Sequence, residues 1–135
     1  MELLNILAAA AAAAAYVFGA IWYMSLSKPW MAATGIKESD LKDENGKNKS
    51  GPMPFIIALL SAFVVSFMMQ HLFDLVGVTQ LIDGLMLGLG IGLFIAAPWT
   101  VTHYNFSMKP RNLVFIDAGY STIGCAVIGM VLTLF

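Results

Sequence analysis

Charge is what this 135-residue sequence lacks most, since only 11% of its residues are charged while 59% are hydrophobic. A soluble globular domain carries about 25% charged residues, so this chain has too few to cover a surface that faces water. The net charge of −1 provides no basic face for phosphates, which argues against nucleic acid as a partner. Together with a mean hydropathy of +0.81, these shortages indicate an integral membrane protein.

Catalytic motifs are missing as well. The sequence has no glycine-rich phosphate loop, no HExxH zinc motif and no serine in a nucleophile elbow. Its single cysteine, Cys125, lies in an apolar run and has no second cysteine for an internal disulfide, which is typical of a packing residue. We therefore expect a protein that is not an enzyme and that uses no cofactor and no metal ion.

Four long apolar stretches dominate what is present, at residues 3–26, 54–77, 80–103 and 113–135. Each is close to the ~20 residues that a helix needs to cross ~30 Å of hydrocarbon. The polar–apolar alternation of a membrane barrel is absent, and the acidic start at Glu2 disfavours a cleaved signal peptide. The sequence predicts one all-α domain over residues 1–135, an integral membrane bundle of four transmembrane helices in antiparallel, up-and-down order.

A polar loop at residues 27–53 separates the first two stretches and holds five of the seven Lys and Arg residues. The other two, Lys109 and Arg111, precede the last stretch on the same side of such a bundle. Because Lys and Arg favour the cytoplasmic side, we expect a multi-pass protein of the cell membrane with both termini outside. The second and third stretches are separated by only a few residues, so we expect them to be antiparallel neighbours.

Small residues recur at every fourth position in the third stretch, at Gly84, Gly88 and Gly92. Residues four apart share a helix face, and small residues let membrane helices approach closely. Gly19 and Gly124 belong to similar stripes in the first and last stretches. The stripes are consistent with close packing of the bundle and also with a narrow path lined by small groups.

Asp117 is the polar residue that most needs an account, because an ionisable group inside a membrane is costly and is a functional candidate by default. It follows Arg111 by six residues and so lies ~9 Å further along the helix. Residues at a similar depth complete a candidate cluster for a cation, a proton or a polar solute: Trp22, Tyr23, His103, Asn105, Asp117 and Tyr120. The alternative is an aromatic belt with Asp117 in a salt bridge to Lys109 or Arg111.

A second polar group is predicted toward the outer side. His71 and Asp74 are three residues apart and can meet on one helix, with Asp83 just across the short link. A histidine and two carboxylates make up half of a metal site. The simpler interpretation puts Asp74 and Asp83 at the water interface, where Asp83 suits the positive end of its helix dipole.

Two parts of the sequence resemble the domain of unknown function 1761 family, whose members are small, mostly bacterial membrane proteins. Residues 19–23 (Gly-Ala-Ile-Trp-Tyr), 28–31 (Lys-Pro-Trp-Met) and Gly35 are similar to the end of that family's first helix. Residues 111–129, with Phe-Ile-Asp-Ala-Gly-Tyr at 115–120, are similar to its last helix. The resemblance implies four spans and a bacterial inner-membrane location, and it implies no activity.

Two functions therefore remain open. The first is a small transporter or channel for a proton-coupled, cationic or small polar solute, with Asp117 as its charge-bearing residue. The second is a non-transporting accessory or scaffold protein that packs on a larger membrane complex or on lipid, with Gly88 and Gly92 as its contact face. Since one packed four-helix bundle has little interior, we expect a homo-oligomer, with a dimer favoured, or a larger complex.

Overall fold

The structure is a computed structural model that describes residues 2–49 and 51–134. All the regular elements in this part of the chain are helices. Four of them are long and apolar enough to cross a membrane, over Ile6–Ser25, Met53–Val76, Leu81–Phe106 and Arg111–Thr133. The predicted all-α class and the four spans are therefore confirmed, while the predicted end at residue 135 lies outside the described residues.

The helix ends follow the turn residues rather than the limits of the apolar runs. Helix α1 (Glu2–Ser25) is followed by α2 (Ser27–Thr34), which ends at Gly35 in the left-handed conformation. After the short α3 (Glu38–Leu41), α4 (Met53–Val76) ends at Gly77 in the same way. Helix α7 (Arg111–Thr133) begins directly after Pro110, two residues before the predicted start, because proline fixes the boundary and the polar Arg111 does not.

The third span is built from three segments: α5 (Leu81–Ile91), the π-helical turn η1 (Gly92–Ala96) and α6 (Ala97–Phe106). The π turn comes just before Pro98, where the missing N–H and the ring disturb the regular hydrogen-bond pattern. The sequence predicts a bend at this place. The helix also continues three residues past the predicted end at 103, as far as Phe106.

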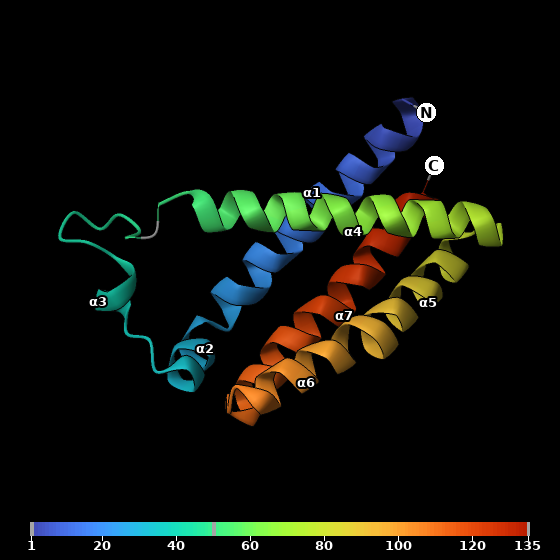
Figure 1. Cartoon of the computed structure of the whole chain (residues 1–135). Coiled ribbons are helices and arrows are strands. Elements are labelled where there is room, and N and C mark those ends of the chain that lie inside the picture. The colour runs from blue at the N-terminus through green and yellow to red at the C-terminus, as the bar shows by residue number, and fades with distance from the viewer. Residues whose placement is uncertain (1, 50, 135) are drawn as a thin grey trace.

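Helix α7 lies between two neighbours, with α1 on one side and the α5–η1–α6 rod on the other (Figure 1). Helix α4 packs mainly on α1 and crosses it obliquely, while its contact with α7 is small (Figure 1). The core lies where α1, α4 and α7 meet, and its members are apolar or small: Ala11, Ala15, Met69, Phe73, Cys125 and Ile128.

The short link at residues 77–80 does not make α4 and α5 neighbours along their length. Helix α4 makes its main contacts with α1, and α5 makes its main contacts with α7. The physical reason is that α5 and α7 carry glycines that fit each other, whereas the buried face of α4 fits the alanines of α1. The prediction that these two helices are neighbours is therefore wrong.

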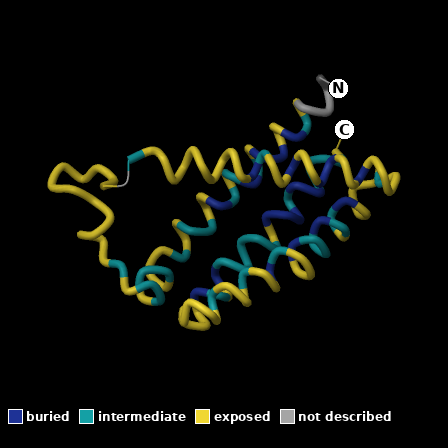
Figure 2. Tube along the Cα trace, viewed as in Figure 1, coloured by how far each residue is buried: buried dark blue, intermediate teal, exposed yellow. Residues whose placement is uncertain are grey.

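The two halves of α4 differ in burial, as Figure 2 shows. Ala62, Ser66, Met69, Gln70 and Phe73 are buried, from the tenth residue of the helix onward and at the spacing of one helix face. In the first half, residues 53–61 are all exposed. The described part of the chain therefore leaves these residues largely uncovered.

Glycines bring the backbones of α5 and α7 into direct contact. A Cβ atom on Gly84 would lie 2.5 Å from the Gly129 carbonyl oxygen, and one on Gly92 would lie 2.5 Å from the Cα of Thr122. A Cβ on Gly88 would overlap the carbonyl of Cys125. These glycines, which we predicted to form a packing stripe, thus contact a helix of the same chain.

Candidate functional site

The carboxylate of Asp117 joins three helices near one end of the bundle. The Tyr23 hydroxyl, from the last turn of α1, donates to Oδ1 of Asp117 at 2.5 Å. The Tyr104 hydroxyl, from α6, donates to Oδ2 at 2.5 Å. The two phenols together thus give each oxygen of this carboxyl group one hydrogen-bond donor.

A pairing of aromatic rings with glycines brings α1 and α7 close enough for this contact. The ring of Trp22 lies over Gly119, where an added Cβ would be 2.9 Å from its Cζ2 atom. The ring of Tyr120 lies over Gly19, with Cε1 2.7 Å from an added Cβ. Each of the two helices therefore packs one aromatic ring against a glycine of the other helix.

Further contacts fix these rings in place. The Trp22 indole N–H donates to the Ile116 carbonyl oxygen at 2.9 Å. Phe18 stacks on Tyr120 with ring centroids 6.2 Å apart, and Tyr23 meets Tyr120 edge-on at 5.3 Å. Such pairs stabilise beyond the area that they bury. Asp117 is thus bound at the rim of a packed aromatic cluster.

Four residues of the candidate cluster come together in this way, namely Trp22, Tyr23, Asp117 and Tyr120. His103 and Asn105 do not join them. Both are exposed, the His103 ring pairs with Trp99 at 6.2 Å, and the Asn105 amide donates to the Val101 carbonyl at 2.7 Å. The residue between them, Tyr104, takes the place facing Asp117.

The π turn explains why sequence spacing led to His103 instead of Tyr104. Gly84, Gly88 and Gly92 are buried at intervals of four, but the next buried residue is Ala97, five positions later. A π turn inserts one extra residue and so moves the buried face along by one. Tyr104 lies two turns after Ala97 and therefore shares its face, whereas His103 does not.

The salt bridge considered for Asp117 is replaced by these two hydrogen bonds. In the described part of the chain its partners are the tyrosines, rather than Lys109 or Arg111. The charge is therefore stabilised by polar groups that carry no charge of their own. Because these partners supply no positive charge, a cation or a proton can neutralise the carboxylate at this site.

The second predicted group does not form a compact site. His71, Asp74 and Asp83 are all exposed at the end of the bundle where α4 is linked to α5. Among the described residues, no three His, Cys, Asp or Glu side chains lie close enough to hold a metal ion. Their exposure fits the interpretation that Asp74 and Asp83 lie at the water interface.

The predicted packing glycines of the first and last spans have different surroundings. Gly19 is in tight contact with Tyr120, whereas an added Cβ on Gly124 would reach only Tyr120 Cε1, at an ordinary 3.9 Å. Gly129, which the spacing argument missed, makes the closest approach to α5, against the Gly84 carbonyl. It lies two helical turns after Thr122, the residue that contacts Gly92, so both residues belong to the face of α7 that packs on the third span.

Comparison with curated proteins and with solved structures finds no match. The family model described as "Protein of unknown function (DUF1761)" matches residues 6–133. The match covers the four spans, the polar loop between α1 and α4, and every residue of the Asp117 cluster. This chain therefore belongs to the DUF1761 family.

Proposed function

We propose that this protein is a small oligomeric transporter or channel for a proton-coupled, cationic or small polar solute. The observation that carries the proposal is the Asp117 carboxylate, which lies within a span and, among the described residues, is held by the hydroxyls of Tyr23 and Tyr104. Carboxylates within membrane helices are expensive and commonly mark ion or proton pathways. Asp117 is the residue that would carry or exchange the charge.

The two tyrosines would act as exchangeable partners of that carboxylate. A phenol hydroxyl both donates and accepts hydrogen bonds, so an arriving cation can take over the carboxylate while the hydroxyls turn to the solute. A protonated Asp117 would turn one phenol from donor to acceptor, since one carboxyl oxygen then carries an O–H group that donates. Either event would loosen the contact between α1, α6 and α7.

The π turn supplies a place for movement. Helix α5 is fixed to α7 by glycine contacts, while α6, which carries Tyr104, follows the irregular turn and Pro98. π turns occur frequently at functional sites, and irregular turns next to proline are common bending points. Bending there would withdraw Tyr104 from Asp117 without disturbing the α5–α7 contact.

The test is flux through the full chain reconstituted in vesicles. Proton flux is followed with an internal pH dye, and potassium and tetramethylammonium are supplied as probe cations. Asp117→Asn should abolish the flux of the transported probe, because it removes the charge and keeps the shape. Asp83→Asn, a matched change at an exposed carboxylate, should leave it intact. Normal flux in a folded Asp117→Asn protein would refute the proposal.

The accessory function remains the second candidate, favoured by the exposed first half of α4. Gly88 and Gly92 are buried against α7, so they are not available to a partner. Residues 56–61, which are all exposed, are the better contact surface, and a second copy is the occupant that we propose. Disulfide cross-linking of Ala58→Cys in membranes should then give a dimer. Val101→Cys, on another exposed position, serves as the control.

We further propose that the protein lies in the cell membrane, with both termini outside and with the two Lys- and Arg-containing links in the cytoplasm. It involves no catalytic reaction. Labelling of single introduced cysteines with an impermeant thiol reagent at Gly46 and at Thr79 would test it, since only the Thr79 site should react in intact cells.

A further inference from the structure

The polar loop between α1 and α4 folds into a defined shape. Asp43 accepts backbone hydrogen bonds from Asn45 and Lys47, each at 2.9 Å, and Lys42 and Asn48 form an antiparallel bridge around Gly46. Lys49 N donates to the Leu41 carbonyl at 2.8 Å. The result is a small hairpin, residues 41–49, with fixed sides.

Two hollows lie against this hairpin, and they differ in whether carboxylates line them. One has a volume of about 590 Å³ and is lined by polar and basic residues with the start of α4: Lys42, Gly46, Lys47, Asn48, Gly51, Pro52 and Phe55. The other is lined by Glu38, Ser39, Lys42, Asp43, Glu44 and Lys49. Among the described residues, the carboxylates therefore line the second hollow and none lines the first.

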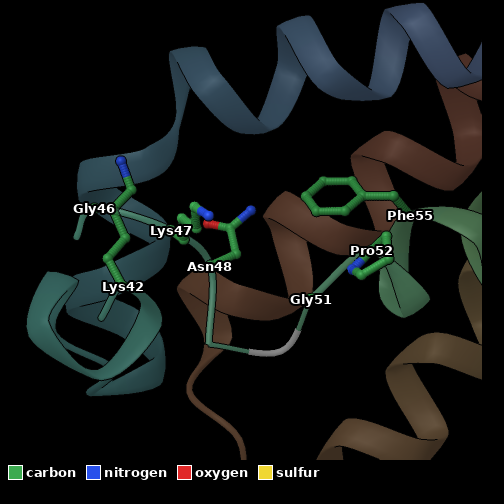
Figure 3. A pocket seen from close by; sticks show the side chains of 7 residues that line it. All are labelled: Lys42, Gly46, Lys47, Asn48, Gly51, Pro52 and Phe55. Carbon is green, nitrogen blue, oxygen red and sulfur yellow. The ribbon is translucent and has the colours of Figure 1, made fainter. Parts of the chain in front are cut away.

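The first hollow, which we name the basic hollow, lies where the second span begins. Figure 3 shows Lys42, Lys47 and Asn48 on one side of it, with Pro52 and Phe55 on the other. Phe55 is half exposed and is followed by an exposed apolar stretch of α4. In a membrane, this places the lysines at the level of the lipid headgroups and Phe55 just below them.

We propose that the basic hollow binds the phosphate group of an anionic phospholipid. Lys42 and Lys47 compensate the negative charge, the Asn48 amide donates a hydrogen bond, and Phe55 contacts the upper part of the acyl chains. Lysine binds phosphate as a point charge, and basic residues next to a span attract anionic lipids. The inference does not depend on any transport by Asp117.

The occupant is a lipid rather than a soluble anion because one wall of the hollow is apolar and continues into the span. A free phosphate would gain from the lysines but nothing from Phe55. An anionic lipid uses both walls, and its headgroup is held at this depth by the bilayer itself. The second hollow, which shares Lys42 with the first, is also lined by Glu38, Asp43 and Glu44, and these carboxylates would repel the same headgroup there.

The experiment titrates the full chain in a non-ionic detergent with phosphatidylglycerol or phosphatidylcholine and counts the bound lipids by native mass spectrometry. Phosphatidylglycerol should bind more tightly. The double variant Lys42→Gln/Lys47→Gln should weaken its binding about 30-fold, from the contribution of two lysines near a membrane surface. The control Lys28→Gln/Lys49→Gln changes the net charge equally and retains both lysines of the basic hollow, so it should bind as the unaltered protein does.

Three results would overturn the proposal. Equal binding of the two lipids, or an equal loss in both double variants, would mean that the hollow is not a selective site. Displacement of phosphatidylglycerol by millimolar inorganic phosphate would identify a free-phosphate site instead. Circular dichroism and size-exclusion profiles verify the fold of each variant. All these substitutions are on exposed side chains, so the proteins should remain intact.

Discussion

The two contacts of α7 differ in what they are made of. Its contact with α5 joins backbone to backbone through glycines, whereas its contact with α1 and α6 near Asp117 is made of aromatic rings and hydroxyl groups. Backbone contacts have one arrangement, because no side chain is present that could change rotamer. Hydroxyl groups and aromatic rings can adopt several arrangements, because their side chains can change rotamer. The α5–α7 contact is thus suited to a fixed support, and the Asp117 contact to a part that moves.

The largest expected effect comes from filling the α5–α7 contact. Gly88→Leu would force a side chain into the Cys125 backbone and should cost about 3 kcal/mol or more of unfolding free energy, since overpacking displaces backbone. Gly90→Leu, two residues away with open space around it, should have little effect. Thermal unfolding in detergent micelles compares the two, and similar melting of both variants would contradict the assignment of a rigid support.

The Asp117 contact should be weaker when tested in the same way. Tyr23→Phe or Tyr104→Phe removes one hydrogen bond, which should cost about 1 kcal/mol, in line with interhelical hydrogen bonds in membranes. The double variant should lose more than the sum, because the carboxylate then has neither donor. Free energies of unfolding by titration with a denaturing detergent measure this coupling.

Tyr16→Phe provides the control for these variants. It removes a hydroxyl from the same helix α1 and leaves the carboxylate with both of its donors. Strict additivity of the two single changes would mean that the tyrosines act separately. Asp117 would then not link α1 to α6.

The spans were predictable because length and apolar character determine them directly. Every predicted span has a helix, and the helix ends differ from the predicted ones by at most three residues. The observed ends lie next to Pro110 and Gly77 or, for the third span, at Phe106. The neighbours of α4 were not predictable from its short link to α5. Which helices touch depends on matching faces, such as Gly84 against Gly129, and a single sequence does not pair those faces.

The Asp117 cluster was predictable in part. Depth along each helix brought Trp22, Tyr23, Asp117 and Tyr120 into one group, because depth follows from counting residues. The angular position of α6 did not follow, since the π turn moves its face by one residue and replaces His103 with Tyr104. Pro98 indicates a local irregularity and does not specify whether the helix bends or gains a residue.

The smallest change in unfolding free energy is expected at the α1–α4 contact, which differs from both contacts of α7. Ser66 is fully buried on the face of α4 that packs on α1, and its hydroxyl has no hydrogen-bond partner among the described residues. Because an unsatisfied buried hydroxyl costs free energy, Ser66→Ala should stabilise the protein by up to about 1 kcal/mol. Ser61→Ala, on the exposed half of the same helix, should change nothing. A destabilised Ser66→Ala protein, measured by the same detergent unfolding, would mean that the hydroxyl bonds across the interface, and α4 would then be held to α1 by polar contact as Asp117 holds α6.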